Sequence, residues 1–135
     1  MTVTPKRLIR ALDTRDGHRC AWHWDGACDV ATLVPQHRMN RGMGGSKQAM
    51  TIANLVWLCA EFNGLIEADA RMARVAVGRG IKVPRNGRYT AADIPIRHAV
   101  HGWVLLRDDG FVTPLLEATA YELLDVYGLL NREVG

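Results

Sequence analysis

The chain has 135 residues and a mass of 15.0 kDa, which is the size of one domain with room for a small appendage. Hydrophobic residues make up 48% and charged residues 23% of the chain, so the composition supports a folded core and excludes intrinsic disorder. The formal net charge of +3 and the pI near 9.0 permit an acidic partner such as nucleic acid without requiring one.

Neither a membrane span nor a secretory signal is expected. No stretch reaches the roughly 18 apolar residues that a transmembrane helix needs, and the N-terminal residues MTVTPKRLIR lack the apolar region of a signal peptide. We therefore expect a soluble, cytoplasmic protein. Three cysteines, an odd number, argue against a secreted disulfide scaffold and leave metal binding open.

The N-terminal segment predicts a helix. Thr4-Pro5 is typical of a helix start, with Thr4 as the cap and Pro5 in the first turn. Asp16-Gly17 is typical of a helix end, because glycine readily adopts the left-handed conformation found there.

Two strand candidates then enclose a loop. Residues 32–34 form a short strand candidate that runs into Gln36-His37. The glycines of residues 38–49 predict a loop, because glycine destabilises regular structure. Residues 52–59 (IANLVWLC) are apolar and partly β-branched, so they are either a strand or a buried turn of helix.

The second half of the chain predicts two helices and a hairpin. Residues 61–80 have the apolar spacing of one helix, and residues 82–97 indicate a connecting loop. Residues 102–113 resemble a β-hairpin that turns at Asp109-Gly110, and a C-terminal helix opens at Thr113-Pro114. Together these elements predict an α+β fold. One side of the last helix is apolar and fits either a docking surface or plain core: Leu116, Leu123, Leu124 and Leu130.

Four groups of polar residues follow one another in the order found in a nuclease family. They are Cys20-x2-His23, Gln36-His37, Asn54 and Cys59-x3-Asn63-x3-Glu67. With the stretches QHRMNRGMGGSKQ, ANLVWLC and NGLIEADA, this order resembles the HNH endonucleases, in particular those of phage type. The resemblance covers roughly residues 14–80 and implies a ββα fold around one metal ion. It divides the chain into an HNH-like domain, residues 1–81, and residues 82–135, in which the connecting loop, hairpin and helix pack on or beside that domain.

The resemblance also implies a role for each residue of the site. His37 is the general base, whose imidazole takes a proton from water at neutral pH, and Asn54 orients that imidazole. Gln36 and Asn63 stand where the family holds a catalytic Mg²⁺ or Mn²⁺. Two neutral amide oxygens hold a hard cation weakly. Glu67, one helical turn after Asn63, offers a carboxylate that would restore a negative charge.

The loop after His37 combines glycines with positive charges. Arg38, Arg41 and Lys47 flank Gly42, Gly44 and Gly45. Glycines let a backbone approach a phosphate closely and guanidinium groups bind phosphate oxygens, so this loop is expected to bind DNA phosphates. The alternative is a surface turn whose charges only keep the protein soluble.

A second metal site is suggested by the cysteines. Proteins of this family often carry a structural zinc between two CxxC pairs, but here the pairs read Cys20-Ala-Trp-His23 and Cys59-Ala-Glu-Phe62. Cys28 can replace the missing ligand, which gives a Cys₃His set of Cys20, His23, Cys28 and Cys59. The alternative is three buried thiols that act as small apolar residues, with Phe62 packed where a ligand would stand.

These features predict a metal-dependent DNA endonuclease that hydrolyses phosphodiester bonds in the cytoplasm of a phage host. The alternative is a catalytically impaired HNH-like module of a phage, which binds DNA or another phage protein. Gln36 favours that alternative, because the family usually has His or Asp at this position.

Overall fold

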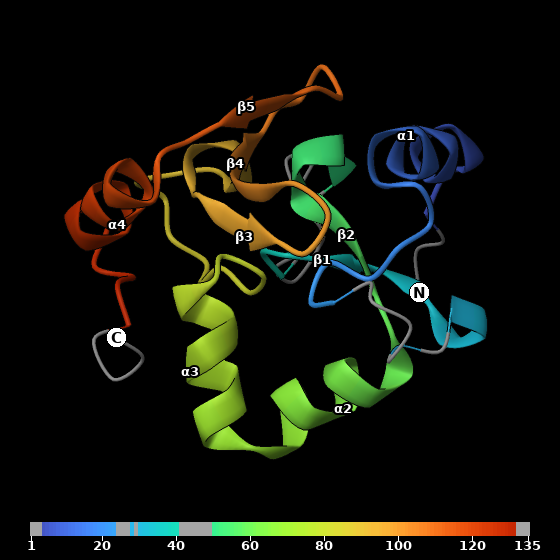
Figure 1. Ribbon diagram of the computed structural model, residues 1–135, viewed down its shortest axis with the longest axis horizontal. Coiled ribbons are helices and arrows are strands. Elements are labelled where there is room, and N and C mark those ends of the chain that lie inside the picture. Colours follow the sequence, from blue (N-terminus) through green and yellow to red (C-terminus); the bar gives the residue numbers. More distant parts are fainter. Residues whose placement is uncertain (1–3, 24–27, 29, 41–49, 132–135) are drawn as a thin grey trace.

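Figure 1 shows the computed structural model of the chain, which describes residues 4–23, 28, 30–40 and 50–131. These residues form four α-helices and two small antiparallel sheets, so the predicted α+β class is confirmed. Among them, no helix is long and apolar enough to cross a membrane. The elements are α1 (Lys6–Asp16), β1 (Val34–His37), β2 (Leu55–Leu58), α2 (Ala60–Ala68), α3 (Ala70–Gly78), β3 (Ile96–His98), β4 (Gly102–Leu106), β5 (Val112–Pro114) and α4 (Glu117–Val126).

Helix α1 ends where the sequence predicts. Gly17 adopts the left-handed conformation with φ 69°, and its N–H donates to the Asp13 carbonyl over 2.7 Å. The predicted start is wrong in detail, because Pro5 occupies the cap position and no side chain caps the helix. Leu8 and Leu12 are buried, so the helix packs against the core through this apolar face.

The segments around the glycine-rich loop form an antiparallel hairpin. The register pairs Val34 with Leu58 and His37 with Leu55, and all of β2 is buried. Of residues 52–59, Leu55–Leu58 form the strand β2, and Ile52–Asn54 form a short 3₁₀ turn before it. Helix α2 follows β2 directly, which gives the order β1–β2–α2.

The expected single helix over residues 61–80 is broken into α2 and α3. Asp69 lies between them with an extended backbone (φ −122°, ψ 117°). Its carboxylate accepts hydrogen bonds from the backbone N–H groups of Arg71 and Met72, at 2.8 and 3.2 Å. An aspartate that caps a new helix in this way competes with continuation of the old one, which explains the break.

The C-terminal part contains one strand more than expected. β3 lies in a segment predicted to be a loop, and it pairs with β4 in a three-stranded sheet of order β3-β4-β5. The hairpin of β4 and β5 turns near Asp109-Gly110 as predicted. Helix α4 begins at Glu117 rather than at Thr113-Pro114, because these two residues belong to β5.

Both halves of the chain contribute to one main core. This cluster contains Leu12 from α1, Leu55 from β2, and Ile96, Val104 and Leu106 from the three-stranded sheet. In the view of Figure 1 the three-stranded sheet lies above the β1–β2 hairpin, and α2 and α3 lie below it. In this view the hairpin thus lies between the C-terminal sheet and the pair of helices α2 and α3.

Candidate functional site

The four residues of the predicted zinc site come together. The sulfur atoms of Cys20, Cys28 and Cys59 and one ring nitrogen of His23 all lie within 4.8 Å of one another. Cys59 comes from the junction of β2 and α2, and the other three come from the segment after α1. The Ala21 N–H donates to the Trp57 carbonyl over 2.8 Å, which fixes that segment against β2. The group therefore joins parts of the chain that are far apart in sequence.

The chemistry of this group suits a soft cation. The three thiols are buried and form no disulfide. Burial raises the pKa of Cys28 well above its usual range, and the neighbouring Cys59 and Cys20 raise it further. A cation placed beside a buried thiol offsets the charge of the thiolate form, and a tetrahedral Cys₃His set is a usual zinc site.

Phe62 packs beside this group, in the position where a second CxxC pair would have its last cysteine. Its ring meets the His23 ring edge-on at 4.6 Å and stacks on Trp22 at 5.0 Å. The expected packing of Phe62 is therefore present together with the Cys₃His group. An aromatic cover of this kind excludes water from the ligands.

His37 is the last residue of β1, and the chain after it is held by Asn54. The Asn54 carboxamide oxygen accepts from the Met39 N–H at 2.7 Å, and its NH₂ group donates to the Met39 carbonyl at 3.0 Å. The Arg38 N–H also donates to the Asn54 carbonyl at 2.7 Å. Asn54, which is buried, thus fixes the backbone that carries His37, and direct orientation of the imidazole stays a prediction.

The expected ligands of the catalytic ion lie on β1 and α2. Asn63 and Glu67 are one helical turn apart on α2, and Gln36 lies opposite Val56 in the hairpin. The Asn63 Oδ1 atom is buried and has no hydrogen-bond partner among the residues that the structure describes. Glu67 is exposed. In the described part of the chain no hydrogen bond or ion pair joins the three side chains, so the ligand set stays a prediction.

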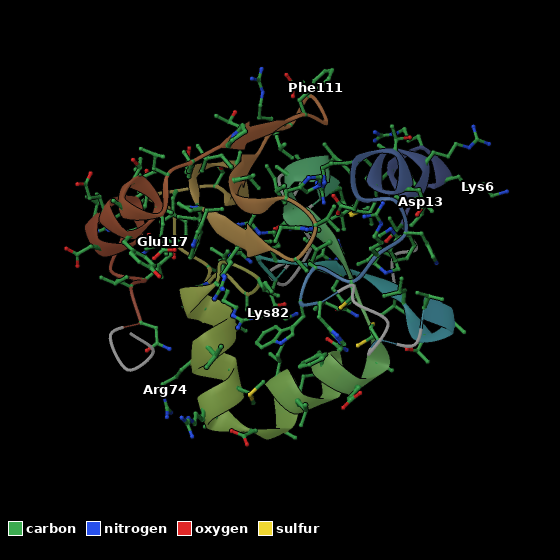
Figure 2. The ribbon with its side chains drawn as sticks, viewed as in Figure 1. Lys6, Asp13, Arg74, Lys82, Phe111 and Glu117 are labelled. Atoms are coloured by element: carbon green, nitrogen blue, oxygen red, sulfur yellow. The ribbon has the colours of Figure 1, made fainter. Side chains whose placement is uncertain are left out.

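Lys82 is a residue of this region that the sequence analysis did not single out. It is half-buried between Ile81 and Val83, both of which are buried, and Val83 donates to the Arg38 carbonyl at 2.8 Å. Figure 2 shows Lys82 among the side chains between the hairpin and the two helices α2 and α3. Burial lowers the pKa of Lys82, and the nearby charge of Glu67 opposes that effect. The Lys82 ammonium group therefore lies close enough to Glu67 for the two charges to interact. The sequence signal for Lys82 was its position, as a charged residue between two apolar ones.

The expected role of Arg38 in phosphate binding is wrong. Arg38 is only 1% exposed, and its guanidinium donates to four backbone carbonyls. Burial and the charge of Arg15 lower the pKa of Arg38 to about 9. A guanidinium whose donors are used inside the core cannot grip a phosphate. The four acceptors, at 2.8 to 3.0 Å, belong to Ala53, Gly80, Ala91 and Ile94. Arg41 and Lys47, the other expected phosphate contacts, lie outside the described residues.

A second cluster of polar residues is buried where α1 meets the three-stranded sheet. Arg15 binds both carboxylate oxygens of Asp16 at 2.7 Å. His98 Nε2 and His101 Nε2 approach the same carboxylate at 3.1 and 2.9 Å. Burial alone would raise the pKa of Asp16, but the hydrogen bonds from Arg15, His101 and His98 outweigh it and hold that pKa far below its usual range.

Asp16, His98 and His101 have ligand atoms close enough to hold a metal ion, but their hydrogen bonds are already arranged without one. The Val100 N–H donates to Nδ1 of His98 at 3.1 Å, so the proton of the neutral ring sits on Nε2 and points at Asp16. Arg15 neutralises the carboxylate. This cluster is therefore an internal ionic network. The sequence offered no signal for it, because His98 and His101 lie more than 80 residues from Asp16.

Comparison with protein-family models, with curated proteins and with solved structures finds no match to this chain. The resemblance to HNH endonucleases therefore stays a prediction from the sequence motifs.

Proposed function

We propose that this protein is a zinc-stabilised, metal-dependent endonuclease that hydrolyses DNA phosphodiester bonds with His37 as general base. The observation that carries the proposal is the position of His37, the last residue of β1 in a β1–β2–α2 unit whose strand–helix junction holds Cys59 of the Cys₃His group. This is the chain order that the motifs imply for a ββα nuclease. A histidine at the end of a strand is well placed to activate water for attack on phosphorus.

The residues expected to bind the catalytic Mg²⁺ or Mn²⁺ offer oxygen donors. They are Gln36, Asn63 and Glu67, and the buried Asn63 Oδ1 without a hydrogen-bond partner in the described structure is the kind of atom that a hard cation satisfies. When bound, such an ion stabilises the charge that develops on phosphate oxygens. His37 takes the proton of the attacking water, and Asn54 holds the backbone that positions His37.

The Cys₃His group is proposed to hold the structural zinc. Its donors, three thiols and one imidazole, match the ligands that zinc takes in closed tetrahedral sites. The ion would join the segment after α1 to the start of α2. It would thereby fix the helix that carries Asn63 relative to the hairpin that carries His37.

The proposal is tested by incubating supercoiled plasmid with purified protein and Mg²⁺ or Mn²⁺. We expect nicking by the wild type and none by His37→Ala. His18→Gln is the control, since His18 is an exposed histidine that pairs with Asp13 outside the proposed site. Equal nicking by the wild type and His37→Ala, or no nicking by the wild type, would refute the proposal.

A second candidate is a DNA-binding module with an impaired catalytic site. Two observations favour it: Gln36 is a neutral residue at a ligand position, and Lys82 already places a positive charge near Glu67. The variant Gln36→Asp decides between the two, because a carboxylate holds a hard cation better than an amide. If the wild type binds DNA without cutting it and Gln36→Asp cuts, the second candidate is supported.

A further inference from the structure

Two arginines without counter-ions line a hollow on the surface of the described structure. Arg79, at the end of α3, and Arg97, in β3, face a hollow of about 410 Å³ whose other walls are Trp22, His98, Ala99 and Gly102. This volume lies within the ~300–1,000 Å³ typical of ligand sites. The hollow is thus large enough for a ligand rather than only for water.

The walls of the hollow are held in place by backbone hydrogen bonds. The Arg97 N–H donates to the Arg79 carbonyl at 2.8 Å, and the Ala99 N–H donates to the Ala21 carbonyl at 2.8 Å. The Arg79 guanidinium lies over the Trp22 ring, 4.6 Å from its centre, and Trp22 stacks on Phe62. An ordered cation–π pair orients the guanidinium before any ligand arrives, which reduces the entropy lost on binding.

Among the described residues, no acidic side chain balances the charge in the hollow. None of its lining residues is acidic, and within the described part of the chain neither guanidinium forms an ion pair with a carboxylate. Among the described acidic residues, Asp16 contacts the lining by accepting from His98, and Arg15 neutralises Asp16. Burial lowers the pKa of Arg79, and the neighbouring positive charge of Arg97 lowers it further. Two like charges held together in this way favour an anion between them.

A second, smaller hollow adjoins the first, so the site extends along the surface. Arg79 and Arg97 also line this space of about 40 Å³, together with Trp103 and Tyr121. The two guanidinium groups therefore lie between aromatic residues on both sides. A polymer with repeated phosphates uses such an extended surface, whereas a single small anion occupies only one point of it.

We propose that Arg79 and Arg97 bind the phosphodiester backbone of a nucleic-acid strand. This inference rests on the proposed function, because it supplies the phosphate contacts that Arg38 does not make. The contact path from Arg79 through Trp22 to Phe62 ends next to Asn63 on α2. These contacts link the arginines to α2, the helix that carries Asn63.

The test measures binding of a fluorescently labelled DNA oligonucleotide by anisotropy at several salt concentrations, without added divalent cation. We expect the double variant Arg79→Gln/Arg97→Gln to bind roughly tenfold more weakly or worse, because two phosphate contacts are lost. The slope of log affinity against log salt should fall by about 1.4–1.8, since each contact contributes ~0.7 to ~0.9. Arg107→Gln removes one positive charge from the exposed β4–β5 turn and is expected to bind like the wild type.

Arg97→Glu is the second variant, since Arg97 is exposed and its replacement leaves the core intact. Because it reverses the charge, Arg97→Glu should bind DNA more weakly than Arg97→Gln, the single variant that only removes the charge. Unchanged binding by these variants, or an equal loss in Arg107→Gln, would overturn the proposal. Binding of inorganic phosphate that depends on Arg79 and Arg97, without DNA binding, would also overturn it in favour of a free anion. Because no cleavage is measured, these outcomes are independent of whether the protein cuts DNA.

Discussion

Replacing Arg38 with methionine is expected to destabilise the protein strongly, although arginine is usually a surface residue. Methionine fills a similar volume but donates no hydrogen bond, so the carbonyls of Ala53, Gly80, Ala91 and Ile94 lose the guanidinium that binds them. Each bond to a charged group contributes about 1.5–3 kcal/mol, but removal of the buried charge also recovers part of its desolvation cost. The net loss should be about 3–5 kcal/mol, a large part of the ~5–15 kcal/mol stability of a typical domain.

The measurement is urea unfolding followed by tryptophan fluorescence, with thermal unfolding in parallel. A loss of that size lowers the Tm by about 10–20 °C in a domain of this length. Arg107→Met is the matched control, since Arg107 pairs with Asp109 at an exposed turn and should change the stability by less than ~1 kcal/mol. If Arg38→Met is as stable as the control but binds DNA more weakly, Arg38 faces a ligand and our description of the core is wrong.

Two further outcomes follow from the buried clusters. Elemental analysis of the purified protein should find one zinc per chain, and Cys59→Ser should lose that zinc and unfold at a lower temperature. A wild-type protein that contains no zinc, and whose Tm does not change when zinc is added, would exclude the zinc site. Acid should also destabilise the protein. The folded-state pKa of Asp16 lies below its unfolded value of about 3.9, so the stabilisation that it gives is present above that value and is lost as the pH falls. Burial lowers the pKa of His98 as well, so folding favours its neutral form and this contribution is lost as the pH falls below about 6.5. Urea titrations from pH 7 to pH 3 should show this decline, and Asp16→Asn should flatten its acidic part; parallel curves for the two proteins would refute the assignment.

Features encoded by residues close in sequence were predictable. Gly17 ends α1 because its own backbone favours the left-handed conformation. A strand was one of two alternatives for the apolar run of residues 52–59, and the structure has that strand over Leu55–Leu58. The Cys₃His group was predictable because ligand spacing constrains which residues share an ion. Asp69 could also have been recognised, since an aspartate before a new apolar repeat is a usual helix cap.

Features that depend on long-range contacts could not be predicted. From the sequence, Arg38 resembles a surface cation beside glycines. It is an internal residue because it donates to the carbonyls of Gly80 and Ile94, which lie 42 and 56 residues further along the chain. β3 has three residues, too few for a periodic pattern, and forms because β4 supplies its partner. The Arg79–Arg97 pair is likewise made by the docking of β3 against the end of α3.

The central claim, that His37 acts as the general base, is tested most directly by chemical rescue. Cleavage of a labelled DNA oligonucleotide is measured for the wild type and His37→Ala in Mg²⁺ or Mn²⁺, with and without added imidazole. We expect His37→Ala to be inactive and imidazole to restore part of its activity. Asn63→Ala should be inactive with or without imidazole, because imidazole does not replace an oxygen ligand. Cleavage by His37→Ala at the wild-type rate without imidazole would rule out His37 as the general base.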